Sequence, residues 1–495
     1  MKKYIDPFDS KTEEYARKFD QYYDEKNVNA TKELINDIEQ QLEDFDELSK
    51  ARLGYSLGTA YSDIMLVEKY NEDIKKKSIY YYNYAINILE KTELREENKP
   101  YIYPVMMNAY VNYGNALENI GRISSSIEYY KKALKINKEN KMALGNLSIS
   151  YIEYAMLLYD HGHRDFFNKA AYDGLKKLFE LSFSKEDLIN KSAILKFEGY
   201  LKSFSEEYIQ YLNTRKYDLE ITEYEEEELK YRQWASKNNL FLNPLNDLYH
   251  DIRIAYDIIH LPNMFVEIGE KPIYHGMYNQ FKEEYIYLRY LFYEATQSNR
   301  VTHYADRDNL LLELYDLPLY SIRLEKLKTV FRQLYSMFDK IAYFINSYYE
   351  LGIPERKVSF KNIWNEKLTV KNKLNIEDNF MLKTLYWTSK EIYSNDSFST
   401  NSLAEEIDVI RNHLEHKYVK IYFDGYEIDS IEKDDPLAKY IAEEKIENMT
   451  MYLMKLIREI IINLSLMVNI EENKKDKNVK TMKIKFDICR DEWKM

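Results

Sequence analysis

Residues that interrupt helices are scarce along this chain. Its 495 residues include 12 glycines and 9 prolines, which is few for a protein of this length. Glycine and proline punctuate strands and turns, and both destabilise the interior of a helix. Their scarcity favours long, uninterrupted helices, so the sequence predicts an all-α fold.

The size and composition are those of a folded protein with more than one part. The length allows two to four domains, or a solenoid followed by a globular domain. An apolar fraction of 45% is too high for a disordered chain. The 49 tyrosines suit seams between helices, where the ring is buried and the hydroxyl stays in contact with water.

The charge and the single cysteine exclude several classes of protein. A formal net charge of −13 argues against a protein that coats nucleic acid through a basic surface, although it allows a small site for one RNA strand. With Cys489 alone, the chain can form neither an intramolecular disulfide nor a cysteine-based zinc site. The N-terminus lacks the apolar core of a signal peptide, and the most apolar stretch, 460–468, is too short to span a bilayer. We therefore expect a cytoplasmic protein without membrane contact.

Periodic apolar residues predict helical hairpins in the N-terminal region. Within residues 108–137, Gly114 and Ala133 are 19 positions apart, which resembles the spacing of small residues in a tetratricopeptide (TPR) helix pair. Small residues at those positions let two antiparallel helices approach closely. A similar pattern occupies residues 55–89, and a third is expected to begin near Leu144.

These patterns divide the chain into three predicted regions. Residues 1–215 are assigned to the TPR-like region, and whether it forms a peptide-binding groove or packs on the next domain is left open. Residues 216–300 are assigned to a connecting helical and loop region. Its stretch 234–247 contains Asn-Pro and clustered Asn and Asp, which are typical of a loop, and apolar residues that would pin the loop to the protein body. A role for this loop in lining an RNA site is the alternative.

The remaining residues, 301–495, predict a helical bundle. Four amphipathic helices are expected: one from about Leu319 to Gly352, one over Phe380–Ile392, one that starts near Ser402 with a Ser402–Glu405 capping box, and one from Leu437 to Val468. Four such helices make an antiparallel bundle. Alternating residues in 481–488 predict a short strand, and 418–428 is its expected partner in a small appended β-hairpin.

The most informative motif is the hexapeptide 411–416, RNHLEH. On a helix at about 100° per residue, Ile407 and Ile410 lie on the stripe that faces the core. The polar side chains form an arc beside that stripe: Arg411, Glu415, Asn412 and His416. Asn412 and His416 are one turn apart and can hydrogen-bond each other.

This arc carries the groups that RNA cleavage without a metal requires. The ribose 2′-hydroxyl attacks the adjacent phosphorus, and an imidazole such as that of His416 can transfer the proton. A guanidinium such as that of Arg411 stabilises charge on the phosphoryl oxygens, and the Asn412 amide can orient the imidazole. Only Glu415 is a good ligand for a hard cation, so we predict neither a metal nor a cofactor.

Other interpretations of these residues stay open at this point. An Arg followed five positions later by His is a weak signal by itself, and the alternative is a solvated helix edge with an ion pair between Arg411 and Glu415. Asp339 and Lys340, on the long helix that begins near Leu319, are expected at the boundary of its apolar face, with a place in the same cavity as the alternative.

The motif Arg411-Asn412-x-x-x-His416 resembles that of HEPN domains. These are helical bundles whose nuclease members carry Arg, a polar residue that is often Asn, three further residues and His. Residues 331–343 and 234–247 are similar to a large bacterial subgroup that joins a TPR-like N-terminus to a C-terminal HEPN domain. The resemblance implies a homodimer whose two motifs meet across a two-fold axis and cut RNA without metal, in antiviral defence or as a toxin.

Tyr418 stands two positions after His416. In HEPN toxins that are paired with a nucleotidyltransferase antitoxin, a tyrosine at this spacing accepts adenylyl groups, which silences the nuclease. The resemblance therefore implies a regulatory modification site at Tyr418. Its helical angle lies nearer the apolar stripe, so a core aromatic is the alternative.

The sequence thus predicts a metal-independent endoribonuclease with RNA as its substrate. The alternative is a non-catalytic interaction protein. In that case the TPR-like region binds a protein or peptide partner, and the HEPN bundle serves for dimerisation or nucleotide binding.

Overall fold

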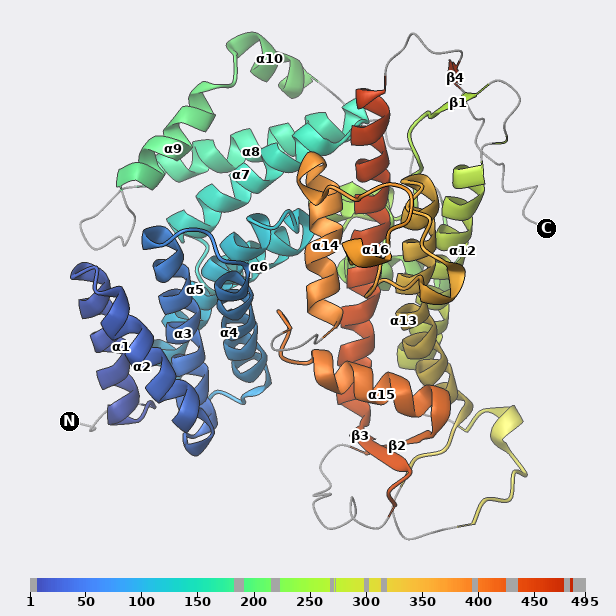
Figure 1. The fold of residues 1–495 in the computed structure, drawn as a ribbon, viewed down its shortest axis with the longest axis horizontal. Helices are drawn as coiled ribbons and strands as arrows, with labels where there is room; N and C mark the ends of the chain where they lie inside the picture. Colours follow the sequence, from blue (N-terminus) through green and yellow to red (C-terminus); the bar gives the residue numbers. More distant parts are fainter. Residues whose placement is uncertain are drawn as a thin grey trace. The chain divides into compact units, whose positions relative to one another are not determined.

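The computed structural model describes residues 7–181, 191–214, 223–267, 271, 273–297, 302–312, 318–393, 399–423, 435–475 and 481–483. Two compact units make up the chain (Figure 1). Unit 1 combines Met1–Tyr217 with Lys390–Glu405, and unit 2 combines Asp218–Ser389 with Glu406–Met495. Helices dominate both units and the strands are short, so the predicted all-α class is confirmed. The boundaries proposed from the sequence for three regions stay predictions.

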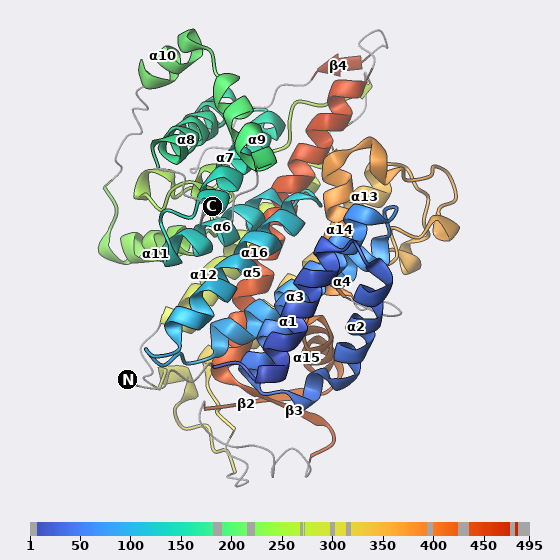
Figure 2. The same ribbon diagram turned by 90° about the vertical axis from the view of Figure 1, so that its left-hand side faces the viewer.

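Unit 1 is a series of helices in which consecutive members pack together (Figure 2). Its helices are α1 (Ser10–Asp24), α2 (Val28–Gln41), α3 (Glu47–Val67), α4 (Glu72–Lys91), α5 (Lys99–Glu118), α6 (Ile123–Ile136), α7 (Lys141–Leu157), α8 (His161–Glu180), α9 (Lys191–Lys202) and α10 (Glu206–Thr214). The most extensive pairs are α3 with α4, α5 with α6, and α7 with α8. The helical hairpins expected at residues 55–89 and 108–137 are therefore present, and their likeness to TPR units stays an interpretation.

Glycines allow the close approach of paired helices in unit 1. A Cβ atom at Gly114 in α5 would lie 2.6 Å from the ring of Tyr130 in α6. A Cβ atom at Gly58 in α3 would lie 2.7 Å from the ring of Tyr82 in α4. Gly114 therefore makes room for the ring of Tyr130 and not for Ala133.

The segment Lys390–Glu405, which belongs to unit 1, makes partly buried polar contacts with α4. The backbone N–H and the hydroxyl of Ser402 both donate to Oδ1 of Asn83 in α4, each at 3.0 Å. The Asn87 amide donates to the Ser402 hydroxyl at 2.8 Å. The predicted Ser402–Glu405 capping box is therefore wrong, because the Ser402 side chain binds a neighbouring helix. Asn401 instead accepts the Leu403 N–H at 2.9 Å.

Unit 2 is built around a bundle of long helices. Its helices are α11 (Glu226–Lys237), α12 (Ile273–Gln297), α13 (Ile322–Tyr348), α14 (Phe380–Ile392), α15 (Ala404–His416) and α16 (Glu443–Lys474), of which α14 and α15 each cross a boundary with unit 1. Short 3₁₀ helices punctuate the chain at Leu42–Asp44, Pro244–Asp247, Ile252–Ile254, Tyr304–Asp306, Glu355–Lys357, Glu366–Leu368 and Ile376–Asp378. In the bundle, α12, α13 and α16 pack side by side (Figure 1).

Apolar periodicity located most of these helices correctly. The long helix expected from about Leu319 is α13, and the helix expected over Phe380–Ile392 has those bounds. The last helix begins at Glu443 instead of Leu437, because residues 438–442 form a strand. Its stretch Ile460–Val468 is buried in the core, as its apolar character predicts.

The strands do not pair as predicted. Strand β2 (Tyr418–Tyr422) runs parallel to β3 (Ala438–Ala442), and β1 (Phe265–Glu267) runs antiparallel to β4 (Thr481–Lys483). A hairpin between 418–428 and 481–488 is therefore wrong, although strands begin at both places; residues 424–428 and 484–488 lie outside the described residues. Alternating hydrophobicity indicates a strand and its buried face, but it does not select the partner.

The loop 234–247 is pinned to the bundle by buried arginines. Arg458 of α16 donates to Asp247 at 2.8 Å, to the Phe241 carbonyl at 2.6 Å and to the Asn243 carbonyl at 2.9 Å. Arg289 of α12 binds the Leu240 carbonyl at 2.9 Å. Buried charges need such complete pairing, so the loop is a structural part of unit 2.

Candidate functional site

Helix α15 presents the predicted motif on an exposed edge. Ile407 and Ile410 are fully buried and anchor the helix in the core. Arg411 and Asn412 are half-buried, and His416, the last residue of the helix, is exposed. The amphipathic pattern therefore placed the polar arc correctly at the boundary between core and water.

Two contacts hold the Arg411 side chain. Its guanidinium carbon lies 5.2 Å from the centre of the Tyr335 ring in α13, a distance at which a cation is attracted to the ring face. Its Nη1 donates to Asn412 Oδ1 at 2.9 Å. Arg411 and Glu415, both of which the structure describes, do not form the ion pair of the alternative interpretation.

Asp408 connects the residues that hold Arg411. Its Oδ1 accepts a hydrogen bond from the Tyr335 hydroxyl at 3.2 Å, and its Oδ2 accepts one from the Asn412 amide at 3.3 Å. Burial and the Asp408 carboxylate both raise the pKa of Tyr335, so its hydroxyl stays protonated and donates. Tyr335, Asp408, Asn412 and Arg411 thus form one continuous polar chain.

A second carboxylate lies near the guanidinium. Asp339 of α13 accepts the Phe360 N–H at 2.9 Å. Burial raises the pKa of Asp339, while the Phe360 N–H and the charge of Arg411 act in the opposite direction. Lys340 instead donates to Glu284 at 2.5 Å. Of this predicted boundary pair, Asp339 is the one whose pKa is affected by the charge of Arg411.

The imidazole of His416 is not oriented as expected. The Asn412 amide donates to Asp408 and its oxygen accepts from Arg411, so the expected bond to His416 is not formed. In the described part of the chain, the His416 ring makes no hydrogen bond. The His413 ring turns back on its own helix, with Nδ1 2.8 Å from the Val409 carbonyl oxygen. His416 therefore projects toward solvent, where a ligand can reach it.

Tyr418 is exposed rather than part of the core. The helix ends at His416, so Tyr418 is the first residue of β2 and its helical angle does not apply. The side chain is 43% exposed, and its hydroxyl donates to Asp435. The same carboxylate lies 3.1 Å from the Lys420 ammonium. The alternative interpretation of Tyr418 as a core aromatic is therefore wrong.

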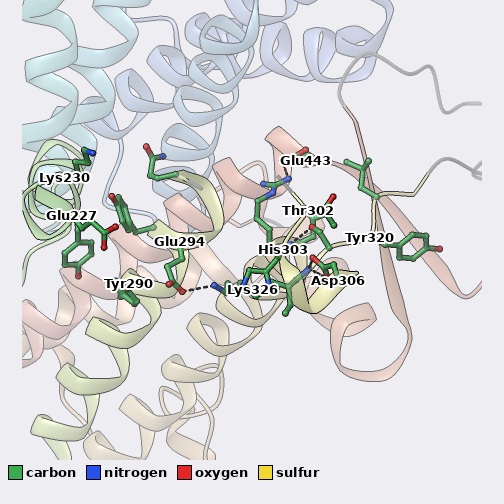
Figure 3. Close-up of a pocket in the computed structure, with 18 of the residues that line it drawn as sticks. Glu227, Lys230, Tyr290, Glu294, Thr302, His303, Asp306, Tyr320, Lys326 and Glu443 are labelled. Carbon is green, nitrogen blue, oxygen red and sulfur yellow. Dashed lines mark hydrogen bonds and ion pairs between the residues drawn. The ribbon is translucent and has the colours of Figure 1, made fainter. Parts of the chain in front are cut away.

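Sequence reasoning missed a large cleft elsewhere in unit 2 (Figure 3). It has a volume of about 1330 Å³ and lies among α11, the end of α12 and the start of α13. Its cations are engaged: Lys326 binds Glu294 at 2.8 Å, and Arg323 binds Glu443. Six of its lining residues are acidic and four are Lys or Arg, so the cleft does not favour an anionic ligand.

The fold and the motif define an all-α protein with an Arg–His motif on a helix of its C-terminal part. Residues 265–471 match the model of the family described as LA2681-like HEPN. The chain therefore carries a C-terminal HEPN domain, which includes α12–α16 up to residue 471 and both Arg411 and His416. The match begins inside the region 216–300 that was expected to be a connector.

The other comparisons add no closer relative. Neither the curated proteins nor the solved structures gave a match. A C-terminal HEPN domain supports a ribonuclease-type or nucleotide-related function. Among the described residues, no helix combines the length and the apolar character needed to cross a bilayer.

Proposed function

We propose that this protein is a metal-independent endoribonuclease in which Arg411 and His416 are the catalytic residues. The proposal rests on the orientation of the Arg411 side chain and the exposure of the His416 side chain within a HEPN domain. The guanidinium is held in one orientation by Tyr335 and Asn412, and the imidazole of His416 stands free at the exposed end of the same helix. HEPN domains typically bind RNA and dimerise, so we propose that the protein acts as a homodimer.

The proposed reaction is an internal phosphoryl transfer. The ribose 2′-oxygen attacks the adjacent phosphorus, and its proton passes to the neutral imidazole of His416. The bond from phosphorus to the 5′-oxygen breaks, and that oxygen takes a proton from water or from the second protomer's imidazolium. The products are a 2′,3′-cyclic phosphate and a 5′-hydroxyl. Arg411 stabilises the negative charge that develops on the phosphoryl oxygens.

Asn412 has a different role from the one the sequence suggested. Its oxygen accepts from Arg411 and its amide donates to Asp408, so we propose that it positions the guanidinium. Groups that are already oriented need no rearrangement as charge develops, which is the main source of electrostatic catalysis. Tyr335 and Asp408 are positioning residues of the same kind.

A cleavage assay in EDTA tests the proposal. Wild type, Arg411→Ala, His416→Ala and His413→Ala are incubated with single-stranded RNA. The last variant is a matched control, because His413 lies on the same helix but turns back on the Val409 carbonyl. We expect wild type and His413→Ala to give 2′,3′-cyclic phosphate ends and the other two variants to lose at least about 100-fold in rate. Equal rates for wild type and His416→Ala would exclude the proposal.

We also propose a role in antiviral defence or as a toxin, which follows from the likeness to the bacterial HEPN subgroup. Overexpression in bacteria should then stop growth, and His416→Ala should abolish the arrest. Growth arrest by both forms would contradict a role for the nuclease in toxicity.

Tyr418 is proposed as a site of regulatory modification. Its side chain is 43% exposed and stands two positions after His416. An adenylyl group on its hydroxyl would add a negative charge next to the site and repel RNA. Mass spectrometry after co-expression with a nucleotidyltransferase tests this, with Tyr418→Phe as the control; an unmodified Tyr418 under those conditions would contradict it.

An interaction protein without catalysis is the second candidate. It is favoured by the net charge of −13 and by the helical hairpins of unit 1, which offer surface for a protein or peptide partner. A monomer in light scattering at micromolar concentration, together with no cleavage in EDTA, would favour this candidate over the nuclease.

A further inference from the structure

A small groove lies where α13 meets the junction of α15 and β2. Its volume is about 290 Å³, near the lower end of the range for small-molecule sites. The lining residues are Glu325, Lys328, Thr329 and Arg332 of α13, and Leu414, Lys417, Tyr418 and Val419 of the junction. All of them belong to unit 2.

Two residues that line the groove are close in the chain to Arg411 or to the Tyr335 ring that it contacts. Arg332 precedes Tyr335 by three positions in α13, so the two residues are one helical turn apart. Lys417 directly follows His416, the last residue of α15, and His416 is five positions from Arg411. At about 1.5 Å per residue, Arg411 and His416 are about 7.5 Å apart along the helix axis. A strand that reaches both Arg411 and the groove therefore needs only a few nucleotides.

The residues that line the groove carry a net positive charge, whereas the whole chain carries a net negative charge. Lys328, Arg332 and Lys417 face one acidic residue, Glu325, which Lys328 binds at 2.7 Å. Arg332 and Lys417 are exposed, and neither side chain makes a hydrogen bond or ion pair with any described residue. Two cations that no described carboxylate neutralises at the rim of one groove produce a local positive potential.

The chemistry of the groove fits a single nucleic acid strand. A guanidinium such as that of Arg332 binds phosphate oxygens in a bidentate manner, and an ammonium such as that of Lys417 binds them as a point charge. The exposed ring of Tyr418 offers a face on which a base can stack. The larger cleft of Figure 3 offers the opposite, because its cations are already paired with carboxylates.

We propose that this groove binds the phosphate backbone of a single RNA strand beside the bond that is cut, through Arg332 and Lys417. The inference rests on the proposed function, since it takes the strand to pass over Arg411 and His416. It assigns the two cations to substrate binding and leaves proton transfer to His416.

The test compares two double variants that remove the same charges. Arg332→Ala with Lys417→Ala changes the groove. Arg356→Ala with Lys361→Ala is the matched control, since these residues are also exposed in unit 2 and have no interaction with any described residue. The probe is a fluorescein-labelled ten-nucleotide RNA with 2′-O-methyl groups throughout, which cannot be cleaved because the nucleophile is blocked. Binding is measured by anisotropy over a series of KCl concentrations.

We expect the groove variant to bind at least about 10-fold more weakly at low salt, and the control to bind within about 2-fold of wild type. Each phosphate contact on a single strand contributes about 0.7 to the slope of log K against log salt, so the slope should fall by about 1.4 in the groove variant only. A DNA strand of the same sequence should behave like the RNA, because the groove contacts phosphates.

The possible outcomes separate this inference from the proposed function. If natural RNA is cut in a His416-dependent way but both double variants bind the probe like wild type, the groove inference is wrong and the nuclease stands. If the groove variant alone loses binding while natural RNA is never cut, the nuclease fails, and the groove binds a nucleic acid strand without a cleavage site beside it. If wild type does not bind the probe, the groove inference is wrong, and the cleavage assay with natural RNA alone decides the nuclease.

Discussion

Arg122, the residue that precedes α6, and Glu391 of α14 form an ion pair in unit 1 in which each side chain is only 4% exposed. Glu391 lies in the segment Lys390–Glu405, which leads from α14 to α15. The same segment is bound by Asn83 of α4 through Ser402. The first two residues of α15, the helix that carries Arg411 and His416, therefore belong to unit 1. We expect the contacts of this segment to affect both stability and activity.

Breaking the buried ion pair should destabilise unit 1 strongly. We expect Glu391→Gln to lower the free energy of unfolding by about 3–5 kcal/mol, because Arg122 would keep a buried charge without its carboxylate. The double variant Arg122→Met with Glu391→Leu should recover most of the loss, since apolar residues of similar volume often replace such pairs without cost. Urea denaturation followed by circular dichroism measures both. A single variant as stable as wild type would show that the pair does not form.

The contact between Asn83 and Ser402 should support catalysis from a distance. Asn83→Ala removes the acceptor of two hydrogen bonds, which should cost about 1–3 kcal/mol of stability. It should also lower kcat for RNA cleavage with little change in KM, because Asn83 binds Ser402, two residues before α15, and does not contact the RNA. Asn98→Ala is the control, since the Asn98 side chain makes no capping hydrogen bond. A loss confined to KM would contradict this coupling.

The Tyr335 ring should be needed to position Arg411. Tyr335→Leu removes both the cation–π contact and the hydrogen bond to Asp408, and we expect kcat to fall by about 3- to 30-fold, which corresponds to about 0.5–2 kcal/mol. Tyr335→Phe keeps the ring and should lose less. Steady-state cleavage of a fluorogenic RNA measures the effect, and equal rates for Tyr335→Leu and wild type would rule out the positioning role.

Unit 1 should become less stable as the pH rises toward neutrality. Burial raises the pKa of Glu118 to about 7, and burial together with Asp20 raises the pKa of Asp63 to about 7. Between pH 4.5 and 7 the folded state therefore holds protons that the unfolded chain has released, so the free energy of unfolding falls with increasing pH.

Thermal unfolding at several pH values checks this. We expect Tm to fall by roughly 2–8 °C between pH 5 and pH 7.5. The double variant Asp63→Asn with Glu118→Gln should flatten the dependence, because neither amide titrates. The same slope in the double variant and in wild type would assign the effect to other groups.

The features that the sequence predicted well are local ones. The scarcity of glycine and proline indicated the helical class, and apolar residues at intervals of three and four located α13 and α14. The same periodicity placed Arg411 and His416 on the boundary of α15, because the buried face of a helix follows from its apolar positions alone.

The partners of polar side chains and of strands were decided by the tertiary structure. Ser402 binds Asn83 instead of capping its own helix, Asn412 binds Arg411 and Asp408 instead of His416, and β2 pairs with β3. Arg332 and Lys417, which are distant in the chain, line one groove for the same reason. A repeating pattern records which face of an element is buried, but a polar side chain or a strand edge bonds to whichever complementary group packing brings within reach. The sequence by itself therefore determined the helices and the exposed edge of the motif, and only the folded chain determined what holds Arg411 and what lies beside His416.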